Sequence, residues 1–151
     1  MTIRAVTVDD TDVWSEMRTA LWPDTDDDHL SEIHDYFNDR SSDMVAVFII
    51  EEGLDSVGFI ELNIRNYAEG SRQTKVPYVE GWYIKPDYQG RGYGKRLMQH
   101  AEAWAMSLGY SELASDAELD NERSISVHKQ LGFQETDRIV CFIKHLTTPS
   151  E

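Results

Sequence analysis

Basic residues are scarce in this chain of 151 residues, which has 14 lysines and arginines against 28 aspartates and glutamates. The net charge of -14 disfavours nucleic-acid binding, because a nucleic-acid-binding protein needs basic groups to neutralise phosphates. An anionic membrane surface would repel the chain as well. We therefore expect no nucleic acid and no membrane as partner, but a cationic small molecule, since a negative field gathers positive ligands. Solubility alone explains acidity in many proteins.

Cysteine and long apolar segments are lacking too. Cys141 is the single cysteine, so no disulfide can form within the chain, which favours a reducing compartment. The longest clear apolar run, Met44 to Ile50, is far shorter than the roughly 18 residues of a membrane span. Residues 1–5 contain no apolar signal core. We expect a cytoplasmic protein, with Cys141 as a buried, inert thiol in an apolar strand.

The length suits one domain, since single cores typically form at about 100–150 residues. We expect this domain at residues 1–146 and a disordered tail at 147–151. Alternating apolar positions or short continuous apolar runs predict strands, and apolar positions three or four residues apart predict helices. The expected strands are 2–6, 44–50, 57–64, 76–84, 110–115 and 138–146. The expected helices are 9–21, 30–37, 94–108 and 122–131.

This order of elements predicts the fold class α/β (α+β mixed). Hairpin-linked strands come first and βα units follow, which indicates a mixed, mostly antiparallel central sheet with helices on both faces. The two strands that flank the longest helix would be parallel and would splay apart. A crevice at such a point is a usual ligand site.

A glycine-rich turn, Gln89-Gly90-Arg91-Gly92-Tyr93-Gly94-Lys95, lies between an expected strand and the longest expected helix. Glycine lets the backbone approach a ligand closely, and N–H groups at a helix N-terminus converge on one point. A pyrophosphate fits such a site. The alternative is a plain glycine turn that leads into a helix, because a short G-x-G pattern has low specificity.

Two motifs together resemble the GNAT acetyltransferase superfamily. The first is Q-x-x-G-x-G, which begins at Gln89 and follows Trp82-Tyr83-Ile84-Lys85-Pro86. The second is Asn121 followed by His128-Lys129-Gln130-Leu131-Gly132-Phe133, which is similar to that superfamily's N…Y-x-x-x-G-F segment. The resemblance covers about residues 2–145 and implies the GNAT fold, whose central sheet splays between two parallel strands. Further segments resemble the aminoglycoside 6′-N-acetyltransferases in particular: 21–23, 64–67, 79–81, 114–116 and 131–137.

The resemblance implies acetyl-CoA as co-substrate. We expect no metal at His29, Glu32 and His34, because no H-E-x-x-H motif is present and histidines five residues apart do not share a helix face well. In that superfamily the backbone of the central strand binds the pantetheine arm like an added strand, which assigns this role to Trp82, Tyr83 and Ile84. One of their N–H groups would polarise the thioester carbonyl, where preorganised donors are worth several kcal/mol. Asn121 would contact the pantetheine arm or support the cofactor loop. The pyrophosphate would lie on Gln89, Gly90, Arg91, Gly92, Tyr93 and Gly94.

The same resemblance makes Glu80 and Asp116 the catalytic carboxylates, which would bind the amine as its ammonium form and accept a proton directly or through water. Trp22 and Tyr67 correspond to aromatic residues of the substrate pocket, where aromatic rings stack on sugars and attract ammonium groups. Asp137 corresponds to an acidic substrate-contacting position. Structural roles stay open: an exposed strand residue for Glu80, a helix cap for Asp116, a core contact for Trp22 and a loop position for Tyr67.

Two further features allow more than one interpretation. His128 stands where many superfamily members have a tyrosine that is thought to protonate the leaving thiolate, so it has either an acid role or a packing role. The acidic residues that follow Pro23 attract a cationic substrate or simply cap the next helix. These residues are Asp24, Asp26, Asp27 and Asp28.

The expected activity is therefore direct transfer of acetyl from acetyl-CoA to the 6′-amine of an aminoglycoside, which implies antibiotic resistance, by a homodimer. One alternative is acetylation of another cationic amine, such as a polyamine or a protein N-terminus. The other is a CoA-binding domain without catalysis.

Overall fold

The computed structural model describes residues 1–24 and 28–147. Contacts divide the chain into two compact units, Met1–Asp116 and Ala117–Glu151, and each is described by itself. The first unit holds the sheet, and the second holds helix α4 (Glu122–Gln130). The single domain over residues 1–146 stays a prediction, and residues 148–151 of the expected tail lie outside the described residues.

The sheet of the first unit has antiparallel strands in the order β1-β2-β3-β4. Gly53, with a φ of 64°, makes the tight turn between the second and third strands, and so lies between the strands predicted at 44–50 and 57–64. The fourth strand covers the predicted residues. The strands are β1 (Thr2–Ala5), β2 (Ala46–Glu52), β3 (Asp55–Arg65) and β4 (Val76–Ile84).

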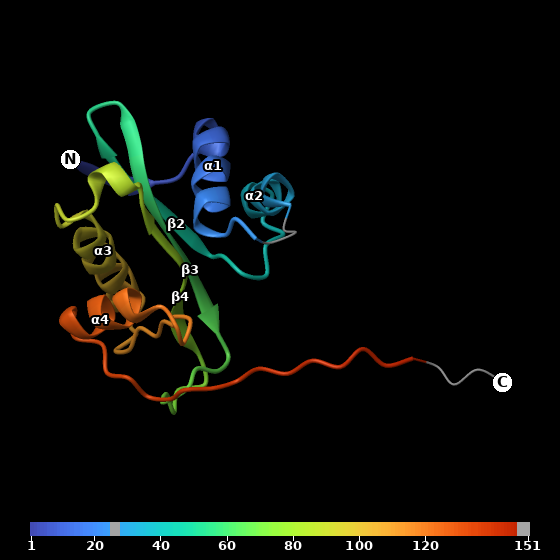
Figure 1. The fold of residues 1–151 in the computed structure, drawn as a ribbon. Coiled ribbons are helices and arrows are strands. Elements are labelled where there is room, and N and C mark those ends of the chain that lie inside the picture. Colours follow the sequence, from blue (N-terminus) through green and yellow to red (C-terminus); the bar gives the residue numbers. More distant parts are fainter. Residues whose placement is uncertain (25–27, 148–151) are drawn as a thin grey trace. The chain divides into compact units, whose positions relative to one another are not determined.

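Helices cover both faces of this sheet (Figure 1). The short 3-10 helix η1 (Val8–Asp10) leads into α1 (Thr11–Leu21), which packs with α2 (His29–Phe37) on one face, while α3 (Tyr93–Ser107) covers the other. Each helix buries one apolar stripe, as the 3.6-residue spacing predicts. The core beneath α1 and α2 contains Trp14, Met17, Ile33, Val47, Ile49 and Phe59. The buried residues of α3 are Leu97, Met98, Ala101 and Ala105.

The predicted strand at 110–115 is wrong. Ala114 alone pairs, in a parallel bridge to Tyr78, with two hydrogen bonds of 2.9 Å. Glu112, two residues before Ala114, bonds through its side chain instead, because its carboxylate accepts a hydrogen bond from the Ser71 hydroxyl. The predicted mixed, mostly antiparallel α/β class with helices on both faces is confirmed, but in the described residues its parallel part is this single bridge.

The predicted closing strand at 138–146 is also wrong. This segment has no regular secondary structure, and its side chains are exposed, with Phe142 at 91% and Ile143 at 85% of full exposure. The continuous apolar run from Ile139 to Ile143 suits a buried strand, but a strand forms only where another strand accepts its backbone hydrogen bonds. Cys141, predicted to be buried there, is exposed for the same reason.

Candidate active site

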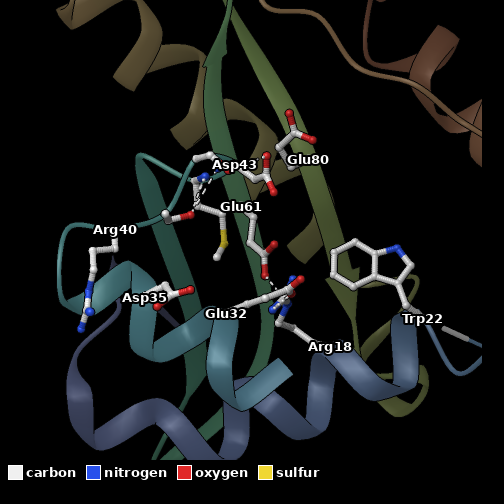
Figure 2. A pocket seen from close by; sticks show the side chains of 11 residues that line it. Arg18, Trp22, Glu32, Asp35, Arg40, Asp43, Glu61 and Glu80 are labelled. Carbon is white, nitrogen blue, oxygen red and sulfur yellow. Dashed lines mark hydrogen bonds and ion pairs between the residues drawn. The ribbon is translucent and has the colours of Figure 1, made fainter. Parts of the chain in front are cut away.

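A cavity of about 440 Å³ lies between α1, α2 and the sheet (Figure 2). Its walls come from the C-terminal end of α1, from α2, from the loop that leads into β2, and from β3 and β4. Carboxylates outnumber guanidinium groups in its lining, which suits a cationic ligand. The carboxylates are Glu32, Asp35, Asp43, Glu61 and Glu80, and the guanidinium groups are Arg18 and Arg40.

The indole of Trp22 forms part of the wall, as Figure 2 shows. It packs directly on β4, because a Cβ added to Gly81 would lie 2.8 Å from Cη2 of Trp22. The His29 ring stacks on the indole at 6.3 Å between centroids, and Cζ of Arg18 lies 5.2 Å from the ring centroid. Trp22, predicted to contact substrate, is thus held by neighbours and faces the cavity.

We expect Gly81→Ala to raise KM for an amine substrate about fivefold, because the added methyl group displaces the Trp22 indole and a ring contact is worth about 1 kcal/mol. Steady-state kinetics and indole fluorescence measure the two effects. In a Trp22→Ala background the same substitution should change KM little, since the clash is gone. An unchanged KM and fluorescence spectrum in Gly81→Ala would show that Trp22 is not part of the substrate wall.

Glu80 enters the cavity through an irregularity of β4. Glu61 pairs with Gly81 and Leu62 pairs with Val79, so Glu80 is the extra residue of a β-bulge. Bulges re-aim side chains and occur often beside active sites. Both Glu80 oxygens accept from Arg65, from Nε at 2.6 Å and from Nη2 at 2.7 Å, and Oε1 also accepts from Asn63 at 3.3 Å.

Asp116, the second predicted catalytic carboxylate, joins Glu80 through a chain of polar contacts. The Tyr78 hydroxyl donates to Oδ2 of Asp116 at 2.7 Å, and the Arg65 guanidinium lies 3.6 Å above the Tyr78 ring. Burial and the bond to Asp116 raise the pKa of Tyr78, so it remains a neutral donor. Asp116 is not among the lining residues of the cavity. It is linked to the lining residue Glu80 through Tyr78, which contacts Arg65, and through Arg65, which binds Glu80.

Glu61 is the most buried of the lining residues that the sequence did not predict. It lies in the buried strand β3 and is 1% exposed, and its Oε2 accepts from Trp14 Nε1 at 2.9 Å and pairs with Arg18 Nε at 3.1 Å. Burial raises the pKa of Glu61 to about 7, against the opposing effects of Arg18 and Trp14. The sequence feature that could have identified Glu61 is its position as a charged residue within an apolar strand, because a buried charge needs a partner.

The glycine-rich turn has the geometry of an anion site. Gly90 and Gly92 have φ values of 79° and 82°, which favour glycine, and Gly92 is the N-cap of α3 without a side-chain cap hydrogen bond. The first N–H groups of α3 are therefore left to other acceptors. Trp82 Nε1 donates to the Gly94 carbonyl at 3.1 Å, and Gln89 Nε2 donates to the Ile84 carbonyl at 3.0 Å, so the end of β4 fixes the turn.

A second cavity, of about 350 Å³, lies where β4 leads into this turn. Tyr83 contributes to it, together with Met17 and Ala20 of α1 and Tyr88 of the 3-10 helix η2 (Pro86–Tyr88). Tyr93 stacks on Tyr88 at 6.5 Å between centroids, and Arg91 lies over the same Tyr88 ring. Apart from Asn121, the residues predicted to hold the cofactor are thus grouped from Trp82 to Gly94 around the end of β4.

Other predicted residues are not brought into the first cavity. Tyr67 is 67% exposed in the loop after β3 and is not in the lining. Asn121, His128 and Asp137 belong to the second unit. There Asn121 caps α4 by accepting from Ser124 N–H at 3.0 Å, His128 packs edge-on against Phe133, and Asp137 Oδ1 accepts from the Arg138 N–H.

The acidic residues after Pro23 are described in part. Asp28 Oδ1 accepts from Ser31 N–H at 3.1 Å and so caps α2, as one of the two interpretations predicts. Asp24 is exposed, and Asp26 and Asp27 lie outside the described residues.

An acidic cavity thus lies beside a bulged strand that runs into a glycine-rich helix N-terminus, an arrangement suited to an acyltransferase. The chain belongs to the acetyltransferase (GNAT) family, whose family model matches residues 12–133. Both the GNAT resemblance and the fold predicted from it are confirmed.

The similarity to particular enzymes covers nearly the whole chain. An aminoglycoside N(6′)-acetyltransferase type 1 from Klebsiella aerogenes is 39% identical over 146 residues, which cover 95% of this chain and 96% of that protein. The crystal structure of an aminoglycoside antibiotic 6′-N-acetyltransferase from Acinetobacter haemolyticus matches with a TM-score of 0.87 at 32% identity, over 97% of this chain and 100% of that one. AAC(6′)-Iy in complex with the bisubstrate analogue CoA-S-monomethyl-acetylneamine matches with a TM-score of 0.86 at 31% identity, over 96% and 98%.

Proposed function

We propose that this protein transfers the acetyl group of acetyl-CoA directly to the 6′-amine of aminoglycoside antibiotics and so confers resistance. The observation that carries the proposal is the acidic cavity, which has an aromatic wall at Trp22 and a carboxylate at Glu80, on the strand that leads into the glycine-rich turn. An aminoglycoside is a polycation of sugar rings, and this lining combines negative charge with a stacking surface.

Acetyl-CoA fits the end of β4 and the turn after it. Among the described residues, backbone pairing on the outer side of β4 is confined to the bridge between Tyr78 and Ala114. We place the pantetheine arm along the end of β4, at Trp82, Tyr83 and Ile84, and its pyrophosphate at the turn from Gln89 to Gly94. The bound co-substrate supplies an activated acetyl thioester. Asn121 completes the cofactor contacts in this proposal.

The amine must lose a proton before it can attack. An amine with a pKa of about 9 is only about 1% neutral at pH 7, which costs roughly 2.7 kcal/mol. Glu80 holds the ammonium group at the site, and Asp116 supports Glu80 through Tyr78 and Arg65. Trp22 and Tyr67 lie against the sugar rings in this proposal, and Asp137 contacts a further amino group. Arg65 occupies both Glu80 oxygens in the free protein, and the incoming ammonium competes with it.

The test is thiol release from acetyl-CoA with three classes of amine: an aminoglycoside, a polyamine and a peptide with a free N-terminus. The proposal predicts turnover at micromolar aminoglycoside and little with the other two. Preference for the polyamine or the peptide would replace the substrate class. Tight acetyl-CoA binding without turnover of any amine would indicate a CoA-binding domain.

We also place the enzyme in the cytoplasm, where its single unpaired cysteine stays a thiol, and propose a homodimer. The exposed apolar side chains of 139–146 support the dimer, because the continuous apolar run from Ile139 to Ile143 is suited to pair with a strand of a second copy. Deleting residues 138–151 should convert the dimer to a monomer in analytical ultracentrifugation. A full-length chain that sediments as a monomer at micromolar concentration would contradict the proposal.

A further inference from the structure

The cluster around Arg18 contains more negative than positive charge. Arg18 is 6% exposed, and it pairs with two carboxylates, through Nη1 with Glu32 at 2.6 Å and through Nε with Glu61 at 3.1 Å. Trp14 donates a hydrogen bond to Glu61 but brings no charge. One cation thus faces two carboxylates. Water solvates part of the Glu32 charge, because that side chain is 40% exposed, whereas the Glu61 carboxylate is buried at 2% and is costly to keep charged unless it takes up a proton or a second cation arrives.

The free side of Glu61 points to the substrate cavity. Oε2 is the oxygen that Trp14 and Arg18 hold, whereas Oε1 lies 3.5 Å from the place where a Cβ on Gly81 would be. Gly81 directly follows Glu80 and lies under the Trp22 indole. Figure 2 shows the Glu61 side chain between Glu80 and Arg18, with Trp22 at the side of the same cavity.

We propose that Glu61 is the proton acceptor of the acetyl transfer. This role rests on the proposed function. The ammonium group of the substrate gives one proton to the Glu61 carboxylate, and its nitrogen lone pair then forms the C–N bond to the thioester carbonyl. The C–S bond breaks, the second nitrogen proton passes to the departing thiolate, and Glu61 releases its proton to water. The sum is amide, CoA thiol and one proton from ammonium and acetyl-CoA.

The charge balance favours this path. With the ammonium group in the cavity, its positive charge offsets the excess carboxylate, and after the proton moves, Arg18 remains paired with Glu32 alone beside a neutral Glu61. Glu80 is less suited to the task, because Arg65 and Asn63 already donate to its oxygens. It binds and orients the ammonium, and Glu61 takes the proton.

The surroundings of Glu61 fit an acceptor that works near neutral pH. The charged groups that face it are Arg18 of α1, Glu32 of α2 and Glu80 of β4, while Asp35 and Asp43 line the same cavity. Burial and the two glutamates raise the pKa of Glu61, and Arg18 and Trp14 lower it, with a result of about 7. A base is most effective when its pKa lies near the working pH. Activity should therefore fall as the pH drops below about 7, where Glu61 takes up a proton beforehand.

The experiment compares the wild-type chain with Glu61→Gln in the pH dependence of kcat with an aminoglycoside. Glutamine keeps the size of the side chain and an acceptor for Trp14. We expect kcat to fall about 30-fold at pH 7, the acid limb near pH 7 to disappear, and the affinity for acetyl-CoA to stay within twofold. Asp55→Asn, an exposed carboxylate at the start of the same strand, should leave kcat and the pH profile as they are.

A second variant, Trp14→Phe, separates a change in the Glu61 pKa from a loss of activity caused by misfolding. Trp14→Phe removes a hydrogen bond that lowers the pKa of Glu61, so the acid limb should move to higher pH. A wild-type kcat and pH profile in Glu61→Gln, or an unmoved limb in an active Trp14→Phe, overturns the acceptor role while aminoglycoside turnover stands. A wild-type chain that acetylates no aminoglycoside overturns the proposed function and this role with it.

Discussion

Glu80→Gln should lower kcat/KM for a 6′-amine aminoglycoside by about 200-fold. Glu80 is the bulge residue that β4 projects into the cavity, and a charge-assisted hydrogen bond to an ammonium group is worth about 1.5–3 kcal/mol. The amide also leaves the Arg65 guanidinium without its counter-charge, so a cation then faces the cationic substrate. Steady-state kinetics at saturating acetyl-CoA measure the effect.

Asp116→Asn should lower the same ratio less, because Asp116 meets the site through Tyr78 and Arg65. Asp55→Asn is the matched control for loss of one exposed negative charge. The acetyl-CoA affinity should hold in all three variants, since none of these carboxylates lies in the glycine-rich turn. If Glu80→Gln and Asp116→Asn both kept the wild-type kcat and KM, the carboxylate account of substrate binding would be abandoned.

Gly92→Val should raise KM for acetyl-CoA about 100-fold. Gly92 has a φ of 82° at the N-cap of α3, a conformation that costs a side chain about 1–2 kcal/mol and that a β-branched residue adopts least readily. To escape the strain the backbone rotates, and the first N–H groups of α3 then no longer converge on a pyrophosphate. Calorimetric titration with acetyl-CoA and with CoA separates this effect from turnover.

The matched control is Gly53→Val. Gly53 also has a positive φ, of 64°, and at both glycines an added Cβ would meet no atom within 4 Å. Both variants should therefore lose similar thermal stability, while only Gly92→Val changes acetyl-CoA affinity. Equal acetyl-CoA affinities in the two variants would contradict the assignment of the pyrophosphate to this turn.

Local patterns were sufficient to predict the elements that position the site. The apolar spacing in α1, α2 and α3, the hairpin at Gly53 and the residues of β4 were all predicted, because each depends on neighbours along the chain. Segment 138–146 has an equally clear pattern and forms no strand, because a strand depends on a partner that its own sequence does not specify.

The chemistry of the cavity was predicted less completely. Trp22 and Glu80 line it as expected, but the bulge that aims Glu80 depends on the register between β3 and β4, which the sequence does not show. Glu61 was missed because its partners, Trp14 and Arg18, come from a distant helix. The roles of Tyr67, Asn121 and Asp137 stay predictions.

The measurement that tests the central claim most directly compares two matched substrates in a thiol-release assay with acetyl-CoA. One is kanamycin, which carries a 6′-amine, and the other is an analogue with a 6′-hydroxyl group and otherwise the same rings. The account predicts rapid release of CoA with the 6′-amine and none above background with the 6′-hydroxyl. Equal turnover of both substrates would contradict the assigned position of acetylation, and turnover of neither, with acetyl-CoA still bound, would contradict the assigned substrate.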